Sequence, residues 1–418
     1  MIKFDFSPLS KIAAENGVGS TEFSQYEERQ EELMRLTAER GQGFWNIIDE
    51  SCQAIKDFAQ SVKYENVAVL AIGGSSLGAI CLQQSLTNLF EKKSLTVLDN
   101  IDPEFLAEYA QQIDLKKTLF MVITKSGGTP ETLAQFFYFR DLLEHSGLDW
   151  KKQMIFITDP KKGYLRKLAS ETGVKTFDVP ENVGGRFSVL TNVGLLPAAL
   201  MGLDVDKLLE GARLARLDAR RTTLVENPAF QLAAAQHLLY LKGKVMNVIF
   251  PYAQKLIRFA DWYRQLLAES IGKAVNLKGE QVNVGITPVF ALGATDQHSQ
   301  NQLYNEGPND KLFLFMSVKE QSANPVIPDS DLPTELNYLK GVSFQKLLHT
   351  EMAGTIAALQ KQDRPMIQIE LEKLDEFHLG YLFFIFEAAT AFLGEMFEIN
   401  TYDQPGVELS KQLTREML

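Results

Sequence analysis

A dense group of polar residues lies close to the end of the sequence, where residues 402–404 and 408–411 flank a Pro-Gly bend. Amide, carboxylate and amine groups gathered around a tight bend at the start of a helix indicate a functional site. Three other polar, glycine-rich segments, around Ser75, Ser126 and Arg186, each follow or interrupt an apolar run that predicts a strand. Together the four segments predict one phosphate-binding pocket.

The first of these segments is Gly73-Gly74-Ser75-Ser76-Leu77-Gly78, which stands between a predicted strand and a predicted helix. Its glycines let the backbone come close to a ligand, and its serines can cap the helix and offer hydroxyls to an oxyanion. The Gly-x-Gly-x-x-Gly spacing of a dinucleotide site is absent. An ordinary strand-to-helix turn explains the same residues, so this segment alone does not establish a site.

The second segment, residues 124–132, carries a stronger signal at the end of another strand. Thr129 and the proline after it are typical of the N-cap and first position of a helix. Thr124, Ser126 and Thr129 therefore bring three hydroxyls to the positive end of a helix dipole, which suits a phosphomonoester dianion. A well-capped helix with a surface lysine, Lys125, is the structural alternative. Because parallel strands end at one edge of a sheet, we expect the first two segments to face the same crevice.

Three further side chains could act on a bound substrate. Arg186 follows two glycines, and its permanent planar charge suits a negative charge that develops on a substrate oxygen, although many arginines are simply solvated. Glu269 lies one turn before a helix stop at Gly272; most such glutamates are solvated, but partial burial would make one a general base. His298 stands in a polar run that is poor core material, which favours proton transfer or hydrogen bonding.

Short apolar runs separated by helix-length stretches predict strands buried on both faces of parallel sheets. These runs are 67–72, 95–98, 119–123, 154–157 and 176–179 in the first half, and 245–250, 312–318 and 366–371 in the second. We therefore predict an α/β protein with two doubly wound, mostly parallel sheets and flanking helices. The predicted domains are a helical lead-in at 1–60, α/β domains at 61–205 and 206–400, and a C-terminal turn and helix at 401–418.

Composition and charge narrow the class further. A chain of 418 residues, with 45% apolar and 23% charged residues, is typical of a folded protein with two or three domains. The net charge of -11 argues against a nucleic-acid or anionic-membrane partner. Cys52 and Cys81 lack a metal-type spacing, so we expect a reducing compartment and neither a disulfide nor a metal site. Since no basic and apolar leader is found, and glutamates interrupt the most apolar helix, we expect a cytoplasmic protein without a membrane span.

Taken in order, these segments resemble the phosphoglucose isomerase family, whose members contain two sugar-isomerase domains. The resemblance extends from about residue 65 to Lys411, and its most specific parts are Gly184 to Ser188 and the tail from Gly394 to Lys411. It implies interconversion of glucose 6-phosphate and fructose 6-phosphate in glycolysis and gluconeogenesis, through ring opening and a cis-enediol, without a metal or organic cofactor. Pro405 stands where the family often has tryptophan, which puts the local shape of the tail in question.

The resemblance also implies a role for individual residues. Glu269 would move the proton between C1 and C2, and Arg186 would stabilise the enediolate. His298 and Lys411 would assist ring opening, with His298 supplied by the partner subunit of a homodimer. The residues that would line the sugar or hold its phosphate are Gly185, Gln404, Ser75, Thr124, Ser126 and Thr129, with Lys125 nearby.

Three other functions fit parts of the pattern. A bifunctional glucose and mannose 6-phosphate isomerase would use nearly the same residues. A non-catalytic sugar-phosphate sensor would keep the serine and threonine loops, but it would not need Glu269, His298 and Lys411 together. A glutamine-dependent aminosugar synthase would require an N-terminal catalytic cysteine and a glutaminase domain, and the sequence contains neither.

Overall fold

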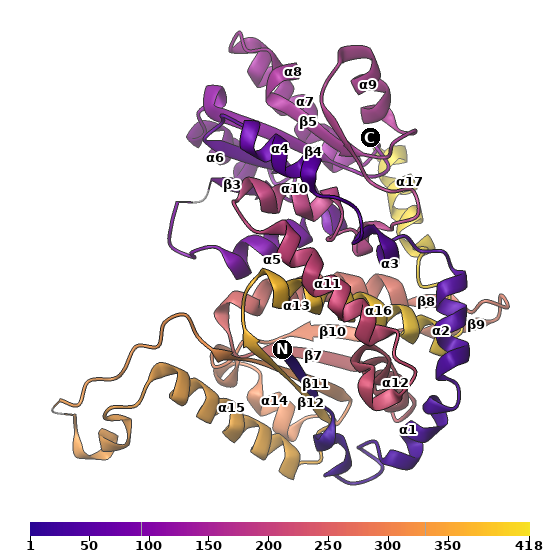
Figure 1. The fold of residues 1–418 in the computed structure, drawn as a ribbon, viewed down its shortest axis with the longest axis vertical. Helices are drawn as coiled ribbons and strands as arrows, with labels where there is room; N and C mark the ends of the chain where they lie inside the picture. Colours follow the sequence, from indigo (N-terminus) through magenta and orange to yellow (C-terminus); the bar gives the residue numbers. More distant parts are fainter. Residues whose placement is uncertain (93, 331) are drawn as a thin grey trace. The chain divides into compact units, whose positions relative to one another are not determined.

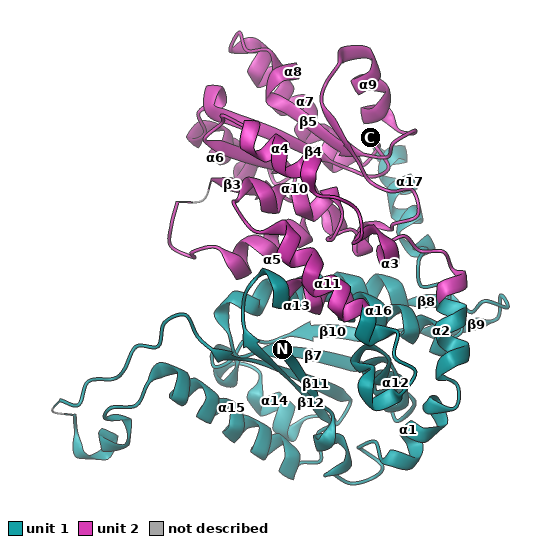
Figure 2. Cartoon of the chain, in the orientation of Figure 1, with its two compact units in different colours: residues 1–37, 217–378, 385–418 teal, residues 38–216, 379–384 magenta. Residues whose placement is uncertain are grey.

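The computed structural model describes residues 1–92, 94–330 and 332–418 (Figure 1). The described chain divides into two compact units (Figure 2): unit 1 contains residues 1–37, 217–378 and 385–418, and unit 2 contains residues 38–216 and 379–384. Each unit is built around one five-stranded sheet, and a small hairpin completes the β-structure described. The α/β fold with two mostly parallel sheets is therefore confirmed, whereas the domain boundaries drawn from the sequence stay a prediction.

The sheet of unit 2 is wholly parallel, with the strand order β3-β2-β4-β5-β6. Its strands are β2 Asn66–Leu70, β3 Leu95–Leu98, β4 Thr118–Ile123, β5 Met154–Thr158 and β6 Thr176–Asp178. All six residues of β4 are buried, as expected of a central strand covered on both faces. The chain passes from β2 to β3 on one side and then to β4 on the other. In doubly wound sheets, ligands bind beyond the carboxyl ends of neighbouring strands from which the chain continues in opposite directions, as it does from β2 and β4.

Helices cover both faces of this sheet. On one face, Phe136 and Phe139 of α7 pack against Phe120 and Val122 of β4. Elsewhere α10 packs against α4 and α5. The helices of unit 2 are α3 Phe44–Ile47, α4 Gln53–Ser61, α5 Leu77–Leu86, α6 Pro103–Gln112, α7 Pro130–His145, α8 Trp150–Gln153, α9 Tyr164–Thr172 and α10 Asn192–Leu200.

The sheet of unit 1 has the order β1-β12-β11-β7-β10, and only β1 is antiparallel to its neighbour. Its strands are β1 Ile2–Asp5, β7 Met246–Pro251, β10 Thr287–Phe290, β11 Lys311–Glu320 and β12 Met366–Lys373. The chain passes from β7 to β10 on one side and then to β11 and β12 on the other, so the order of the first four strands of unit 2 recurs. The hairpin of β8 Lys273–Val275 and β9 Gln281–Val284 precedes β10.

Two strands of the five-stranded sheet of unit 1, and both strands of the hairpin, were not expected. Residues 2–5, expected to belong to a helical lead-in, instead form β1 and pair with β12. The four-residue β10 contains Pro288, which an edge strand tolerates because one side of its backbone needs no donor.

The helices of unit 1 surround the second sheet, and three helices contain residues of both units. The helices within unit 1 are α1 Ser20–Glu27, α12 Pro228–Leu241, α13 Ile257–Ile271, α14 Asn301–Glu306, α15 Phe344–Lys361 and α17 Glu408–Met417. The three helices with residues in both units are α2 Gln30–Glu39, α11 Val205–Ala219 and α16 Glu376–Met396. By length and composition α16 could cross a membrane, but 94% of its most apolar window is buried inside the protein. It is therefore a core helix.

Candidate active site

Three hydroxyls converge where β4 ends and α7 begins, in a segment that we call the phosphate loop (residues 124–129). Thr124 Oγ1 lies 2.7 Å from Thr129 Oγ1 and 3.3 Å from Ser126 Oγ. The Gly128 N–H donates to Ser126 Oγ at 3.2 Å. Thr129 is the N-cap of a 16-residue helix, whose first turn leaves backbone N–H groups to bind other acceptors. This arrangement of hydroxyls and helix end can hold a phosphate dianion.

The glycine loop (residues 73–78) and the arginine loop (residues 181–188) pack backbone to backbone. A Cβ added to Gly74 would lie 2.4 Å from the Gly185 carbonyl oxygen, so only glycine permits this approach. Ser188 Oγ donates to the Gly185 carbonyl at 2.6 Å and lies 3.4 Å from the carbonyl oxygen of Gly74. The two loops, which carry the predicted Ser75 and Gly185, are therefore held in contact.

Arg186 is only 5% exposed, which sets it apart from a solvated surface arginine. A buried guanidinium is expected to be hydrogen-bonded, because taking its charge out of water is costly. The next residue, Phe187, stacks on Phe44 with ring centroids 5.1 Å apart. This aromatic contact fixes the short helical turn Gly185–Phe187 from which the guanidinium extends.

Lys125 is half-buried and links two of these loops. Its Nζ donates to the carbonyl oxygens of Glu181 at 2.8 Å and Val183 at 2.7 Å, both in the arginine loop. Burial lowers the pKa of Lys125. The sequence placed this lysine near the phosphate, and the structure directs its ammonium to the backbone of the arginine loop. Ser75, the phosphate loop, Gly185 and Arg186 thus all lie on connected loops of unit 2.

In unit 1, Glu269 is half-buried in the last turn of α13. Gln265, one turn earlier on the same helix, donates from Nε2 to Glu269 Oε1 at 3.0 Å. A carboxylate held by a neighbouring amide at a helix end is oriented, and part of it still reaches solvent. This geometry suits a general base that must accept a proton from a bound substrate.

Lys273 joins Glu269 to the end of the chain. Its Nζ donates to the Glu269 carbonyl at 2.7 Å and to the Asp403 carbonyl at 2.9 Å. The predicted Gln404 follows Asp403, so the structure brings the tail turn (residues 400–404) to the end of α13. The sequence analysis missed Lys273, although its place four residues after the predicted base was a usable signal.

His298 does not meet Glu269 within one chain. It is exposed in a short 3₁₀ turn, Thr295–His298, beyond the carboxyl end of β10. Glu269 lies near the other end of that strand. A Cβ added to Gly285, just before β10, would lie 3.3 Å from Gly272, the residue that ends the helix carrying Glu269. Residues 287–293 run extended alongside β7 between these two places, a distance of roughly 20 Å.

Lys411 lies in the exposed helix α17, where its Nζ forms an ion pair with Glu408 at 2.8 Å. The helix is entered through the 3₁₀ turn Pro405–Val407. Pro405 is the first residue of that turn, a position where the fixed backbone angle of proline is favourable. The departure from the family at this residue is therefore compatible with a regular helical turn.

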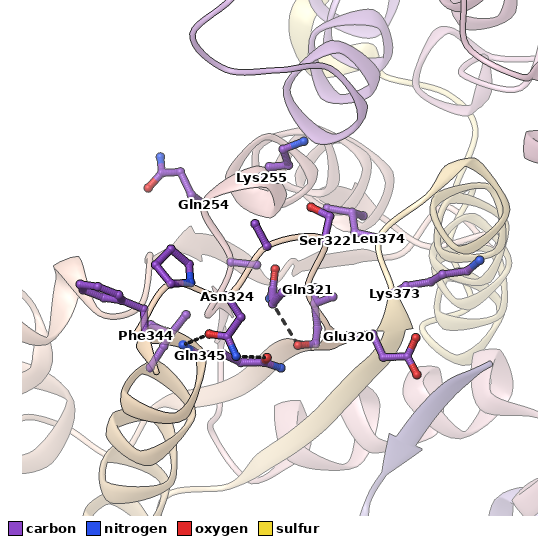
Figure 3. A pocket seen from close by; sticks show the side chains of 15 residues that line it. Gln254, Lys255, Glu320, Gln321, Ser322, Asn324, Phe344, Gln345, Lys373 and Leu374 are labelled. Atoms are coloured by element: carbon purple, nitrogen blue, oxygen red, sulfur yellow. Dashed lines mark hydrogen bonds between the residues drawn. The ribbon is translucent and has the colours of Figure 1, made fainter. Parts of the chain in front are cut away.

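A hollow of about 530 Å³ lies beyond the carboxyl ends of β7 and β11 (Figure 3). Its polar groups largely bond one another: Asn324 Nδ2 donates to Gln345 Oε1 at 3.2 Å, and the Gln345 N–H donates to Asn324 Oδ1 at 3.1 Å. Lys255 and Gln254 point away from its centre in Figure 3. The described residues that line it include none of the predicted site residues, so we do not assign the active site there.

A doubly wound unit with hydroxyls at the carboxyl ends of its strands is typical of a phosphate-binding α/β protein. Residues 57–418 match the family described as "Phosphoglucose isomerase". A protein named glucose-6-phosphate isomerase from Carboxydothermus hydrogenoformans is 46% identical over 404 residues, which cover 92% of this chain and 87% of that protein. The chain belongs to the phosphoglucose isomerase family, as the sequence motifs indicated.

Solved structures share the fold of this chain. A protein from Thermus thermophilus, described as hypothetical, matches with a TM-score of 0.90 and 34% identity, and the match covers 100% of this chain and 99% of that protein. A glucose-6-phosphate isomerase from Chlamydia trachomatis matches with a TM-score of 0.79 over 87% of this chain and 72% of its own. At 24% identity the second likeness shows the fold alone.

Proposed function

We propose that this chain interconverts glucose 6-phosphate and fructose 6-phosphate, the aldose-ketose isomerisation of glycolysis and gluconeogenesis. Its family membership carries this proposal, since relatives named glucose-6-phosphate isomerase are 36% to 46% identical to it over most of their length. The hydroxyl cluster of the phosphate loop adds a physical reason, because both substrates carry a phosphomonoester dianion.

We propose the following roles for the side chains. The phosphate loop, together with Ser75, holds the phosphate, and Gly185 and Gln404 line the sugar. Glu269 removes the proton from C2 of the open-chain aldose and returns it to C1. Meanwhile the C1 oxygen gains a proton and becomes a hydroxyl, and the C2 hydroxyl loses its proton and becomes the ketone. Arg186 stabilises the negative charge of the cis-enediolate. Proton abstraction beside a carbonyl needs such a base and such an electrostatic partner, and the proposal includes no metal or organic cofactor.

We further propose a homodimer in which His298 acts in the active site of the partner subunit and, with Lys411, assists ring opening. The separation of roughly 20 Å between the two ends of β10 supports this arrangement, because Glu269 and His298 of one chain belong to opposite ends. A two-fold dimer would create two such shared sites.

Complementation between two inactive variants tests the shared site. Glu269→Gln and His298→Ala chains, co-expressed, should regain roughly a quarter of native activity, because half of the dimers contain one intact site out of two. Co-expressed His298→Ala and Lys411→Met chains should also regain activity if His298 acts in the partner's site while Lys411 acts in the site of its own chain. If the first mixture is as inactive as its parents, His298 acts within its own chain.

We also propose a cytoplasmic location. The long apolar helix α16 is buried in the protein core, and the substrates belong to cytoplasmic sugar metabolism. Fractionation of the source cells should place the chain with the soluble proteins, and recovery in washed membranes would contradict the proposal.

The activity itself is tested by coupling glucose 6-phosphate formation to a dehydrogenase, with and without chelator. Native protein should convert fructose 6-phosphate, and Glu269→Gln should lose about 10²-fold to 10⁴-fold in kcat. Glu280→Gln, which removes an exposed carboxylate from the nearby hairpin, serves as the matched control. Mannose 6-phosphate as a second substrate decides whether the enzyme is bifunctional. Equal activity in native protein and Glu269→Gln would discard Glu269 as the base.

A further inference from the structure

Lys273 places a buried positive charge between the predicted base and the tail turn. The residue is 7% exposed at the start of β8, directly after the helix α13 that carries Glu269. Burying an ammonium is costly unless acceptors replace the lost water, so its partners must be well placed. Those partners include two carbonyl oxygens, at 2.7 Å and 2.9 Å, and the Asp403 carboxylate at 3.6 Å.

The first contact caps a helix. The last turn of α13 ends with the Gly272 N–H donating to the Ala268 carbonyl, and the chain then leaves the helix. The next carbonyl, that of Glu269, accepts from the Lys273 ammonium instead. A cation at the negative end of a helix dipole is favourable, and the bond fixes the backbone of the turn from which the Glu269 side chain extends.

The second contact anchors the tail turn. Besides its bond from Lys273, Asp403 accepts at Oδ2 from Asn400 Nδ2 at 2.9 Å. The chain before it crosses α16 at Gly394, where an added Cβ would lie 1.7 Å from Thr401 Oγ1. The tail turn is thus closely packed on one side by Thr401 and held on the other by the ammonium.

We propose that Lys273 is a positioning residue of the isomerase, which sets the sugar-lining Gln404 against the base Glu269. One ammonium bonds to the backbone of the base and to the residue directly before the glutamine, so the two groups share one reference point. This inference rests on the proposed function, because it assigns Glu269 and Gln404 to one sugar. Phosphate binding should be independent of it, since the phosphate loop belongs to unit 2.

The same hairpin supplies a matched control. Lys278 Nζ lies 3.2 Å from Glu398 Oε2, and therefore also links the hairpin to the segment before the tail turn. Its side chain is 68% exposed, however, and an exposed ion pair contributes little to holding a structure in place. Comparing the two lysines separates a buried positioning bond from an exposed charge on the same element.

The experiment compares Lys273→Met, Lys273→Gln and Lys278→Met with the native protein. We would measure kcat and KM for fructose 6-phosphate, the affinity for inorganic phosphate, which lacks the sugar, and hydrogen exchange across residues 398–407. Lys273→Met should lower kcat about 10²-fold, the typical effect of a small misplacement of reacting groups. The affinity for inorganic phosphate should stay native, and exchange in the tail turn should become faster. Lys278→Met should match the native protein throughout.

The outcomes decide the proposal in each case. Native kcat in Lys273→Met, or a lower kcat with native exchange in the tail turn, would overturn it. A matching loss of affinity for inorganic phosphate would also overturn it, since the effect would then not be confined to the sugar end of the site. If Lys273→Met does not fold, Lys273→Gln, which keeps a donor for the Glu269 carbonyl, takes its place. If neither variant folds, Lys273 is required for folding itself and the positioning role is overturned. An inactive native protein would refute the proposed function, while hydrogen exchange would still decide whether Lys273 holds the tail turn.

Discussion

Glu387 gives the sharpest prediction about stability. It lies in the core helix α16 with 0% exposure, and neither carboxyl oxygen has a hydrogen-bond partner among the residues that the structure describes. Burial alone raises the pKa of this carboxyl well above its ordinary value of 4.5. The folded protein therefore keeps Glu387 protonated at a pH where the unfolded chain has already released the proton.

The sign of the pH effect follows from this difference. Above pH 4.5 the folded state binds more protons than the unfolded state, so stability falls as pH rises toward the folded pKa. Each pH unit in that window removes about 1.4 kcal/mol. Glu387→Gln abolishes this slope but keeps a buried polar group. Glu387→Met also removes the unsatisfied oxygens, which adds about 1–3 kcal/mol of stability.

The assay is thermal unfolding of native protein and both variants from pH 5 to pH 8. For a unit of this size, 1 kcal/mol corresponds to roughly 2–4 °C, so the advantage of Glu387→Gln should grow by about 3–5 °C per pH unit and then level off. Glu306→Gln, which removes an exposed carboxylate, controls for net charge. Parallel melting curves for native protein and Glu387→Gln across this range would refute the reasoning, because they would mean that the buried carboxyl is ionised.

Three further predictions concern other parts of the chain. Lys125→Met should lower kcat but keep phosphate-ester affinity, because its ammonium holds the arginine loop; Lys161→Met, which breaks an exposed ion pair on that loop, should change neither constant. Gly74→Ala should lower kcat/KM by about 10²-fold, since its methyl would lie 2.4 Å from the Gly185 carbonyl oxygen, and native kinetics would contradict that contact. Burial lowers the pKa of His237 to about 4, so its contribution to stability is complete above pH 6.5 and is lost as pH falls toward 4; an NMR titration midpoint near 6.5 would contradict this.

The sequence predicted the central strands and the loops that follow them, because both depend on local patterns. A fully apolar run such as that of β4, followed by hydroxyl residues and an N-cap, defines a strand end and a helix start without any knowledge of the rest of the chain. The hydroxyl cluster formed by Thr124, Ser126 and Thr129 follows directly from that geometry. The short strands β1 and β10 were missed because four residues carry too little periodicity, and pairing with a long neighbour decides their structure.

The roles of the two lysines could not be predicted in the same way. Lys125 bonds to carbonyls 56 and 58 residues away, and Lys273 bonds to a carbonyl 130 residues away. Backbone carbonyls carry no residue identity, so no side-chain motif records such a bond. What the sequence does show is the position of each lysine inside a functional motif, and only the tertiary structure assigns its ammonium to support of the site.

Four strands of each sheet share one topology, yet we assign a phosphate loop to unit 2 alone, and the described residues beyond the strands explain the difference. In unit 2, glycines and small hydroxyl residues follow β2 and β4, which leaves space and donors for a phosphate. In unit 1, β7 is followed by Tyr252, whose ring would lie 2.4 Å from a Cβ on Gly293 and whose hydroxyl bonds to Thr355 and Gln297. Tyr252 is thus a fully buried, hydrogen-bonded part of the core beyond β7. Glu269, which we propose as the base, lies at the opposite end of the unit 1 sheet, where α13 stops at Gly272.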